Sequence, residues 1–372
     1  EIGVRLVGSE MCIRDRCSVH GNEVGRATGD RLIYKNGRLY FGSQTAGIIY
    51  SEDMGDSWQS VDLFGEKNIS LIWTDSEGKL FIAGCSGEAN SPDGVTRGHT
   101  LYCSTDGLKS FVPLTAPDPV KYENSSYYGF VPQRITSDSR YIYITFASSG
   151  EVFYGGMGAY ACDTGSLSGG KVYRYRIENG VPVFNKDITP EDHIPCGYSG
   201  ICSNGKMLLL STVCRKNGGD IIYTSTDSGE SWKIIMNRLE YCRFDWNIPY
   251  MKPRYNGGGN CVHWISDIKL SPFDSDTALF NTGTGLFMIT GLASGDVLVK
   301  PFCEGIEETV HLNVYTTPHG RNRIIDIIGD LGGFAFEDYD SECENSFANE
   351  NGDRYITCLN ACLLYTSPSP RD

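Results

Sequence analysis

The chain has 372 residues, a formal net charge of −14 at pH 7 and 44 glycines, and aromatic residues make up 12% of it. An acidic surface disfavours nucleic acid and anionic membranes as partners, and no apolar run is long enough to span a membrane. Abundant glycine and aromatic residues favour short strands, tight turns and exposed rings that can stack on sugars. The composition therefore favours a soluble all-β protein that binds a neutral ligand.

The two ends of the sequence do not continue the patterns beside them. Residues 1–16 and 362–372 resemble translated sequencing adapter, as in a fragment read from metagenomic DNA, and we exclude them from fold prediction. The natural segment is then about 17–361, and we expect it to be cut at both ends. A signal peptide would have been lost with the natural N-terminus, so its absence excludes nothing.

The predicted strands recur in units of roughly 40 to 65 residues, each with three short strands joined by Gly- or Asn-rich turns. In chain order the strands are 31–34, 39–42 and 47–50; 71–73, 80–83 and 101–103; 133–135, 141–144 and 171–175; 198–201, 207–210 and 221–223; and 265–270, 278–280 and 285–289. A sixth unit begins near Arg323. Radial repetition buries such strands, so the sequence predicts an all-β β-propeller. Five units and part of a sixth do not close a common ring, and we expect an open arc with unpaired edges.

Three copies of the Asp-box, Ser-x-Asp-x-Gly-x-x-Trp, support this prediction: Ser51–Trp58, Ser104–Phe111 and Ser225–Trp232. The middle copy is interpreted as degraded, with a one-residue deletion and phenylalanine in place of tryptophan. The aspartate of a box accepts backbone N–H groups in a tight turn, and the glycine supplies a positive φ. We expect the boxes to be structural clips and not catalytic sites.

The sequence contains 14 cysteines but no Cys-x-x-Cys and no histidine spacing typical of zinc. Its Asp-rich turns lack the spacing of a calcium loop. We therefore expect no metal and no cofactor. Disulfides and free buried thiols both stay open.

Four long insertions separate predicted strands, and insertions are where binding residues concentrate. They are Ser86–Thr100, Tyr122–Phe130, Ser148–Gly170 and Tyr241–Val262. The last is rich in aromatic residues and glycine, as in a carbohydrate platform, although ordinary loop packing would also account for any one ring.

The candidate catalytic residue is Asp330, which follows the apolar strand 324–328 and has glycine at 329 and 332. The glycines allow close approach of a ligand, and apolar surroundings raise the pKa of a carboxyl, as a general acid needs. The same Gly-Asp-x-Gly pattern also occurs in plain turns. Asp326 is the second candidate, and its alternative role is that of a strand-end residue capping a turn.

Several stretches, taken in order, carry a family resemblance: Gly29-Asp-Arg-Leu32 with 39–42 and the first box, 170–175 with Asp187-Ile-Thr-Pro190, 220–232, Trp264-Ile-Ser-Asp-Ile-Lys-Leu270 through Asp276, 305–309, and Gly329-Asp-Leu-Gly-Gly-Phe334. Together they resemble glycoside hydrolase family 74, whose members cleave xyloglucan with two tandem seven-bladed propellers. The resemblance implies that 17–300 is an incomplete first propeller and 301–361 the start of a second. It also implies a monomer when full length, secretion, and a plant cell-wall polysaccharide as the partner.

The family hydrolyses β-1,4-glucosidic bonds with inversion, using two aspartates across a cleft between the propellers. The resemblance implies that Asp330 is the general acid and makes five rings candidate stacking platforms: Tyr127, Tyr128, Trp246, Tyr250 and Trp264. The general base would lie in an Asp-x-Gly-Gly stretch that does not precede Gly21 here, so we expect the isolated segment to be inactive.

Two other hypotheses about function stay open. A sialidase also carries Asp-boxes, but the arginines here are scattered and an Arg-Ile-Pro motif is missing. A non-catalytic Asp-box propeller that binds glycan or protein is the alternative from another class. The choice between internal and chain-end cleavage depends on loops that the sequence does not resolve.

Overall fold

The computed structural model describes residues 29–43, 46–61, 69–86, 99–114, 131–148, 169–191, 194, 196–215, 219–237, 241–248, 262, 264–283, 285–306, 309–318, 320–329, 332–340 and 347. Every regular element in these ranges is a β-strand. The strands form six sheets, four of them with four strands each.

The first two sheets are antiparallel meanders in chain order. They consist of β1 (Leu32–Lys35), β2 (Arg38–Gly42), β3 (Ile48–Ser51) and β4 (Gln59–Ser60), and of β5 (Ile69–Thr74), β6 (Phe81–Ser86), β7 (His99–Ser104) and β8 (Val112–Pro113). The next two have the same order, with β9 (Val131–Ser137), β10 (Tyr141–Ser148), β11 (Gly169–Glu178) and β12 (Val181–Asp187), and with β13 (Gly197–Ser203), β14 (Leu208–Val213), β15 (Ile221–Ser225) and β16 (Lys233–Asn237).

The fifth sheet adds a strand to this plan. Its meander is β18 (Asp267–Leu270), β19 (Ala278–Thr282), β20 (Gly285–Thr290) and β21 (Leu298–Pro301), and β17 (Arg243–Phe244) pairs with β21 in parallel. The sixth sheet has β22 (His311–Thr316), β23 (Ile324–Ile328) and β24 (Gly332–Phe336).

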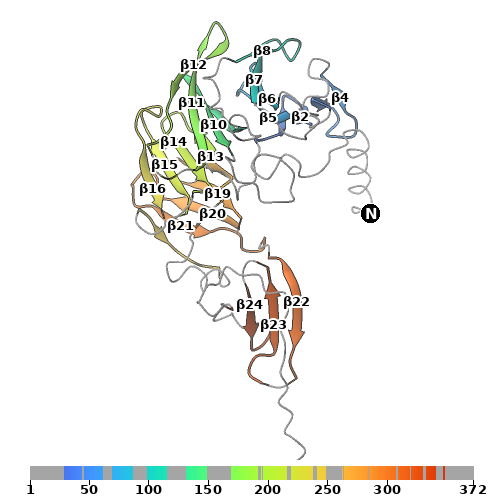
Figure 1. Ribbon diagram of the computed structural model, residues 1–372, viewed down its shortest axis with the longest axis vertical. Coiled ribbons are helices and arrows are strands. Elements are labelled where there is room, and N and C mark those ends of the chain that lie inside the picture. Colours follow the sequence, from blue (N-terminus) through green and yellow to red (C-terminus); the bar gives the residue numbers. More distant parts are fainter. Residues whose placement is uncertain are drawn as a thin grey trace, which may run out of the picture.

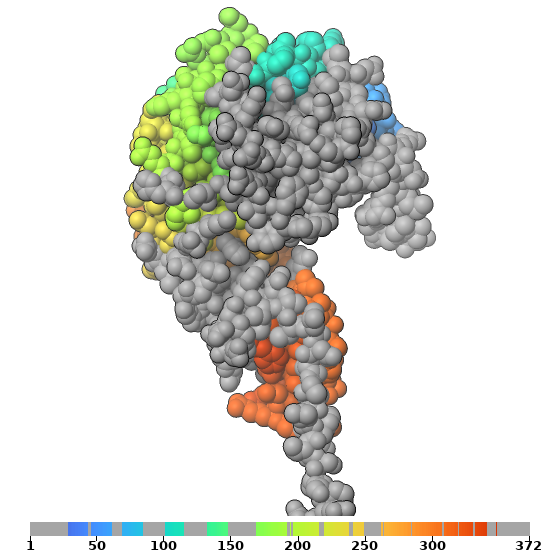
Figure 2. All heavy atoms as spheres, in the orientation of Figure 1, coloured from blue at the N-terminus to red at the C-terminus, as the bar shows by residue number. Residues whose placement is uncertain are grey.

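Figure 1 shows the first five sheets following one another around an arc, with β22–β24 beyond the fifth. Neighbouring sheets contact through their first strands, as β5 does with β1, β9 with β5, β13 with β9, and β18 with β13. In the space-filling view of Figure 2 the residues of β22–β24, in orange, form a projection beyond the five sheets. The arc of radially arranged four-stranded sheets confirms the predicted all-β propeller fold.

The sequence pattern missed the fourth strand of the first five sheets, which lies directly after the box in the three sheets that have one. In the three sheets with a box, the box is the turn from the third strand to the fourth, so that β4, β8 and β16 begin one residue after Trp58, Phe111 and Trp232. The third sheet has no box. Its β11–β12 turn is Asn179–Gly180, with φ values of 52° and 83°, as in a two-residue hairpin turn.

All three boxes share one pattern of hydrogen bonds. In the first, Ser51 Oγ donates to Asp53 Oδ1 at 2.7 Å, and Asp53 Oδ1 accepts the N–H of Ser57 at 2.8 Å. Ser57 Oγ donates to Asp53 Oδ2 at 2.6 Å. The same contacts recur around Asp106 and Asp227. These bonds lower the pKa of each box aspartate to about 2, which supports the structural role expected of the boxes.

The middle box is not shortened, contrary to our interpretation of the sequence. It has the same spacing as the other two, and its glycine lies one position earlier. Gly107 and Leu108 have φ values of 74° and 68°, and the equivalent Met54 and Gly55 have 58° and 101°. The turn therefore needs two consecutive left-handed residues, and glycine at either position relieves part of the strain.

Successive sheets interlock through one apolar residue after each fourth strand. Val61, Leu114 and Ile188 are buried, and their N–H groups donate to Ile48, Leu101 and Val172 of the third strand. Each joins the core between its own sheet and the next; Leu114, for example, packs with Ile142 and Tyr175 of the third sheet. Burial of the apolar side chains in these shared cores supplies the main favourable free energy for the arc.

The fifth sheet extends past the domain boundary that we expected at 300/301. Strand β21 ends at Pro301, the N–H of Phe302 donates to Leu286, and Cys303 is buried in the fifth core. Cys103 and Cys202 are buried free thiols, and burial raises the pKa of Cys202 to about 12. These two positions therefore follow the free-thiol alternative.

Candidate functional site

The strand order places the described residues that flank the four long insertions at one end of the sheets. In an antiparallel meander, the first-to-second and third-to-fourth turns lie at one end, and the second-to-third turn and the exit to the next sheet lie at the other. The boxes are third-to-fourth turns. The insertions follow β6, β8, β10 and β16, which are second or fourth strands. The described residues that flank the insertions therefore lie at the end opposite the boxes.

Trp264 lies at this same end, three residues before the start of β18. Its backbone is left-handed, with a φ of 62°, which is rare for a bulky residue. The residue is partly buried. Of the five candidate platform rings, Trp246 and Trp264 lie among the described residues, and Trp264 is the less buried of the two.

A fully buried carboxylate holds the backbone around Trp264. Asp220 is 1% exposed and accepts the Thr212 hydroxyl at 2.8 Å, the Arg215 N–H at 3.1 Å and the Ile265 N–H at 3.2 Å. Burial raises the pKa of Asp220, and the hydrogen bonds from these groups and from the Trp264 N–H lower it. Burial is the larger effect, so the pKa lies at about 6. We did not identify Asp220 from the sequence. The available signal was an acid directly before the apolar strand β15.

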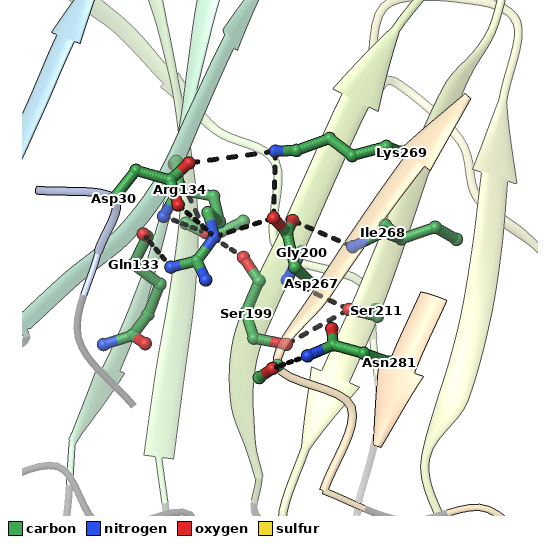
Figure 3. A network of polar contacts seen from close by, with 12 residues as sticks. Asp30, Gln133, Arg134, Ser199, Gly200, Ser211, Asp267, Ile268, Lys269 and Asn281 are labelled. Carbon is green, nitrogen blue, oxygen red and sulfur yellow. Dashed lines mark hydrogen bonds and ion pairs between the residues drawn. The ribbon is translucent and has the colours of Figure 1, made fainter. Parts of the chain in front are cut away.

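A cluster of four charges joins the inner ends of three sheets (Figure 3). Arg134 of β9 lies with its Nε 3.1 Å from Asp267 Oδ2 of β18 and 3.5 Å from Asp30 Oδ1, which precedes β1. Lys269 Nζ lies 3.1 Å from Asp267 Oδ2 and 3.9 Å from Asp30 Oδ2. The cluster contains two negative and two positive side chains, so its net charge is zero. Its ion pairs connect the first, third and fifth sheets near the segment that contains Trp264.

Trp246, which we expected as a stacking platform, lies in the core of the fifth sheet. It is 8% exposed, its ring stacks on Phe244 with centroids 4.9 Å apart, and Phe287 packs edge-on at 6.3 Å. The segment that carries it is held as the outer strand β17 and not as a surface loop, because Arg243 and Asp245 donate to Val297 and Val299. This packing role corrects the expectation for Trp246.

Asp326 lies in the middle of β23 and not at a strand end, so it does not cap a turn. It is 8% exposed, and its two carboxylate oxygens lie 2.8 and 3.0 Å from Nδ1 of His311. The other ring nitrogen of His311 lies 2.7 Å from Thr309 Oγ1. The carboxylate of Asp326 is therefore engaged by a neighbouring strand, which argues against its role as a free general acid.

The remaining candidates, Asp330, Tyr127, Tyr128 and Tyr250, lie outside the described residues. Their assignments stay predictions. Described residues Gly329 and Gly332 flank Asp330 at the turn between β23 and β24, and Gly332 has a φ of 74°.

Among the described residues, no three histidine, cysteine, aspartate or glutamate side chains gather in a way that could hold a metal ion. A helix long and apolar enough to cross a bilayer is also missing from the described ranges.

Known proteins similar to this chain are xyloglucanases. An oligoxyloglucan-reducing end-specific xyloglucanase from Emericella nidulans is 24% identical over 86% of this chain and 45% of its own length. A xyloglucanase from Paenibacillus sp. is 23% identical over 90% of this chain and 34% of its own length. A search of protein-family models finds no match.

Solved structures point to the same fold. The GH74 xyloglucanase from Xanthomonas campestris superimposes with a TM-score of 0.68 at 22% identity, covering 88% of this chain and 46% of that one. A GH74 enzyme from Niastella koreensis gives a TM-score of 0.64 at 21% identity, over 88% and 45% of the two chains. The chain spans about half the length of the relatives it matches, or less. These similarities confirm the resemblance to glycoside hydrolase family 74 that the sequence motifs indicate.

Proposed function

We propose that the protein containing this chain hydrolyses β-1,4-glucosidic bonds in xyloglucan. The observation that carries the proposal is the similarity to proteins named xyloglucanases, which extends over 86% to 90% of the chain and is not confined to the Asp-boxes. Xyloglucan is a plant cell-wall polymer, so we further propose that the protein acts outside the cell. We also propose that the full-length protein is a monomer.

Asp330 is the proposed general acid, which donates its proton to the glucosidic oxygen as the bond breaks. A second carboxylate, from elsewhere in the protein, would deprotonate the attacking water on the opposite face of the sugar. Inversion requires room for that water, which corresponds to a carboxylate separation of roughly 6.5–9.5 Å. Asp330 suits this role better than Asp326, because His311 already engages both carboxylate oxygens of Asp326.

The test is Asp330→Asn in the full-length protein that contains this chain, with release of reducing sugar from xyloglucan as the measurement. General acid catalysis contributes typically 10²–10⁴-fold, so we expect a loss in this range. The matched control is Asp326→Asn, which removes a carboxylate four residues earlier and should retain most of the activity. Proton NMR of the first product should show the α-anomer, as inversion requires.

Three outcomes would overturn parts of the proposal. A loss below about tenfold for Asp330→Asn would exclude it as the acid. Initial β-anomer would exclude inversion. A full-length protein that binds xyloglucan but releases no sugar would favour the alternative function, a non-catalytic Asp-box propeller that binds glycan.

A further inference from the structure

Two stretches far apart in the sequence meet on the inner side of the arc, and none of their residues has a part in the proposed hydrolysis. Gly29 and Asp30 precede the first sheet, whose first strand begins at Leu32. Asp267 and Lys269 lie in β18, the first strand of the meander in the fifth sheet. Figure 3 shows Asp30 and both of these residues in one cluster. Contacts between them therefore link the first sheet to the fifth across the arc.

The backbone of Gly29 and Asp30 lies against the second and third sheets. The carbonyl of Asp30 accepts the N–H of Ile72 in β5 at 2.8 Å. A β-carbon built on Gly29 would lie 2.7 Å from Cβ of Leu71 in β5 and 2.8 Å from the carbonyl oxygen of Gln133 in β9. Real β-carbons essentially never approach other atoms so closely, so this packing requires glycine at position 29. Residues 29–30 are therefore a strap, a segment that leaves the first sheet and packs on the next two.

The side chain of Asp30 extends the contacts of the strap to charged groups of the third and fifth sheets. Its Oδ1 lies 3.5 Å from Nε of Arg134, and its Oδ2 lies 3.9 Å from Nζ of Lys269. Asp267 Oδ2 lies 3.1 Å from each of these two cations. The side chains of Arg134 and Asp267 are 11% and 20% exposed, whereas that of Asp30 is 48% exposed. Salt screens exposed charges more than buried ones, so it weakens the contacts of Asp30 more than the Arg134–Asp267 pair.

The third, fourth and fifth sheets are joined by other contacts, which are neutral and buried. Thr145 of β10 donates its hydroxyl to the carbonyl of Ser199 in β13 at 2.6 Å. Ser199 donates its own hydroxyl to the carbonyl of Ile265, just before β18, at 2.5 Å. A β-carbon on Gly200 would lie 2.5 Å from the backbone nitrogen of Ile268, so the fourth and fifth sheets pack closely there. Because these contacts involve no charged group, salt has little effect on them.

We propose that Gly29 and Asp30 form an ionic strap that fastens the first sheet to the rest of the arc and releases it when the charge of Asp30 is screened or removed. The first sheet packs on the second through a shared core, to which Tyr40 and Ile72 belong. The strap adds contacts to the third and fifth sheets, so its release makes the first sheet easier to open while the third to fifth sheets stay closed. Proteins open in such local units, and units with fewer contacts open first. The inference does not rest on the proposed function.

Hydrogen exchange followed by mass spectrometry tests the strap in the whole chain, by comparing β2–β3 of the first sheet with β14–β15 of the fourth. Raising the NaCl concentration from about 0.01 M to 1 M shortens the Debye length from about 30 Å to 3 Å, which is less than either contact distance of Asp30. The contribution of exposed ion pairs corresponds to at most about fivefold in an equilibrium constant. We therefore expect exchange in β2–β3 to become about two- to fivefold faster at high salt, with little change in β14–β15.

Asp30→Asn should give the faster exchange of β2–β3 already at low salt and remove most of its salt dependence. Asp296→Asn is the matched control, because Asp296 is also exposed and pairs with Arg243 at 3.0 Å inside the fifth sheet. It should leave exchange in β2–β3 unchanged. Gly29→Ala keeps the charge of Asp30 but displaces the strap from Gln133, so it should also accelerate exchange in β2–β3.

Three results would overturn the strap. Equal exchange of β2–β3 in the wild-type and Asp30→Asn chains at low salt would show that the carboxylate does not hold the first sheet. Equal acceleration of β2–β3 and β14–β15 by Asp30→Asn would show that it supports the whole arc and not one sheet. Unchanged exchange in Gly29→Ala would show that the backbone packing of the strap has no such role. If Asp30→Asn does not fold, the salt series on the wild-type chain decides, since a strap predicts faster exchange in β2–β3 alone.

Discussion

The first and third Asp-boxes have the same internal geometry and very different surroundings. In the third box, Trp232 donates its indole N–H to the carbonyl of Ile188 at 2.7 Å. A β-carbon on Gly229 would lie 2.5 Å from Ile188 Cδ1, and Ser228 is 9% exposed. In the first box, Met54 is 68% exposed, and the buried indole N–H of Trp58 has no hydrogen-bond partner among the described residues.

The third box contacts the preceding sheet. Arg174 of the third sheet donates to the carbonyl of Ser228 at 2.8 Å and pairs with Glu230, also at 2.8 Å. Its guanidinium lies 4.5 Å from the centre of the Tyr141 ring. The first box belongs to the first described sheet, and there Arg38 of the same sheet pairs with Glu52. A box therefore encodes its own turn, and the residues of the preceding sheet decide how firmly it docks.

Replacing the docking arginine should show the largest effect. Arg174→Ala removes a 5% exposed side chain and leaves the Ser228 carbonyl without this donor, so we expect a loss of about 2–4 kcal/mol in the free energy of unfolding. The matched change Arg38→Ala breaks an exposed ion pair and should cost less than about 1 kcal/mol. Urea denaturation of both variants measures the contrast. Equal losses would show that the preceding sheet does not hold the third box.

Adding a methyl to each box glycine should give an intermediate contrast. Gly229→Ala suffers both the strain of a φ of 82° and a clash with Ile188, for a cost of about 2–3 kcal/mol. Gly55→Ala has the strain of a φ of 101° but approaches only its own Trp58, at 3.8 Å, so it should cost about 1 kcal/mol. Thermal unfolding would reveal the difference as a larger drop in Tm for Gly229→Ala. The reverse order would contradict the packing described for Ile188.

The two boxes should differ least in how their contribution to stability depends on pH, because the pKa of each box aspartate is set by hydrogen bonds within its own turn. Hydrogen bonds lower the pKa of Asp53 and of Asp227 from the ordinary value of 3.8 to about 2. The stability that each carboxylate contributes is then fully present above pH 4 and is lost as the pH falls through 2. Asp53→Asn and Asp227→Asn should make the acid decline in stability shallower by similar amounts. A marked effect of only one of them would mean that docking, and not the turn, sets the pKa.

Much of the propeller was predictable from the sequence because the first three strands of each sheet are short runs rich in apolar residues, as in β5, β14 and β15, and are separated by turn residues such as glycine and asparagine. The fourth strands of the first two sheets were not, since β4 and β8 have two residues each and both are exposed. Strand β17 is equally short. A tryptophan beside such a short strand, here Trp246, can occur in a surface loop or in a core, and the sequence pattern does not distinguish the two. Short edge strands leave almost no periodic signal.

Residues of the candidate site could be predicted from the sequence only where a local motif contains them. The glycines around Asp330 mark a turn, and a tryptophan before an apolar strand marks Trp264. Asp220, Arg134 and Lys269 gave no such signal, because their roles depend on residues far away in the chain. Asp220 contacts Ile265 across 45 positions, and Arg134 reaches Asp267 from another sheet.

The left-handed pair in the middle box has a consequence for finding such repeats in other sequences. A search template that demands glycine at the fifth position passes over Ser104–Phe111, although Gly107 and Leu108 trace the same turn as their counterparts. A template that accepts glycine at the fourth or the fifth position, and scores the serine and aspartate at fixed spacing, would recover it. Catalogues of blade number built on the stricter rule will undercount propellers whose glycine has moved by one residue.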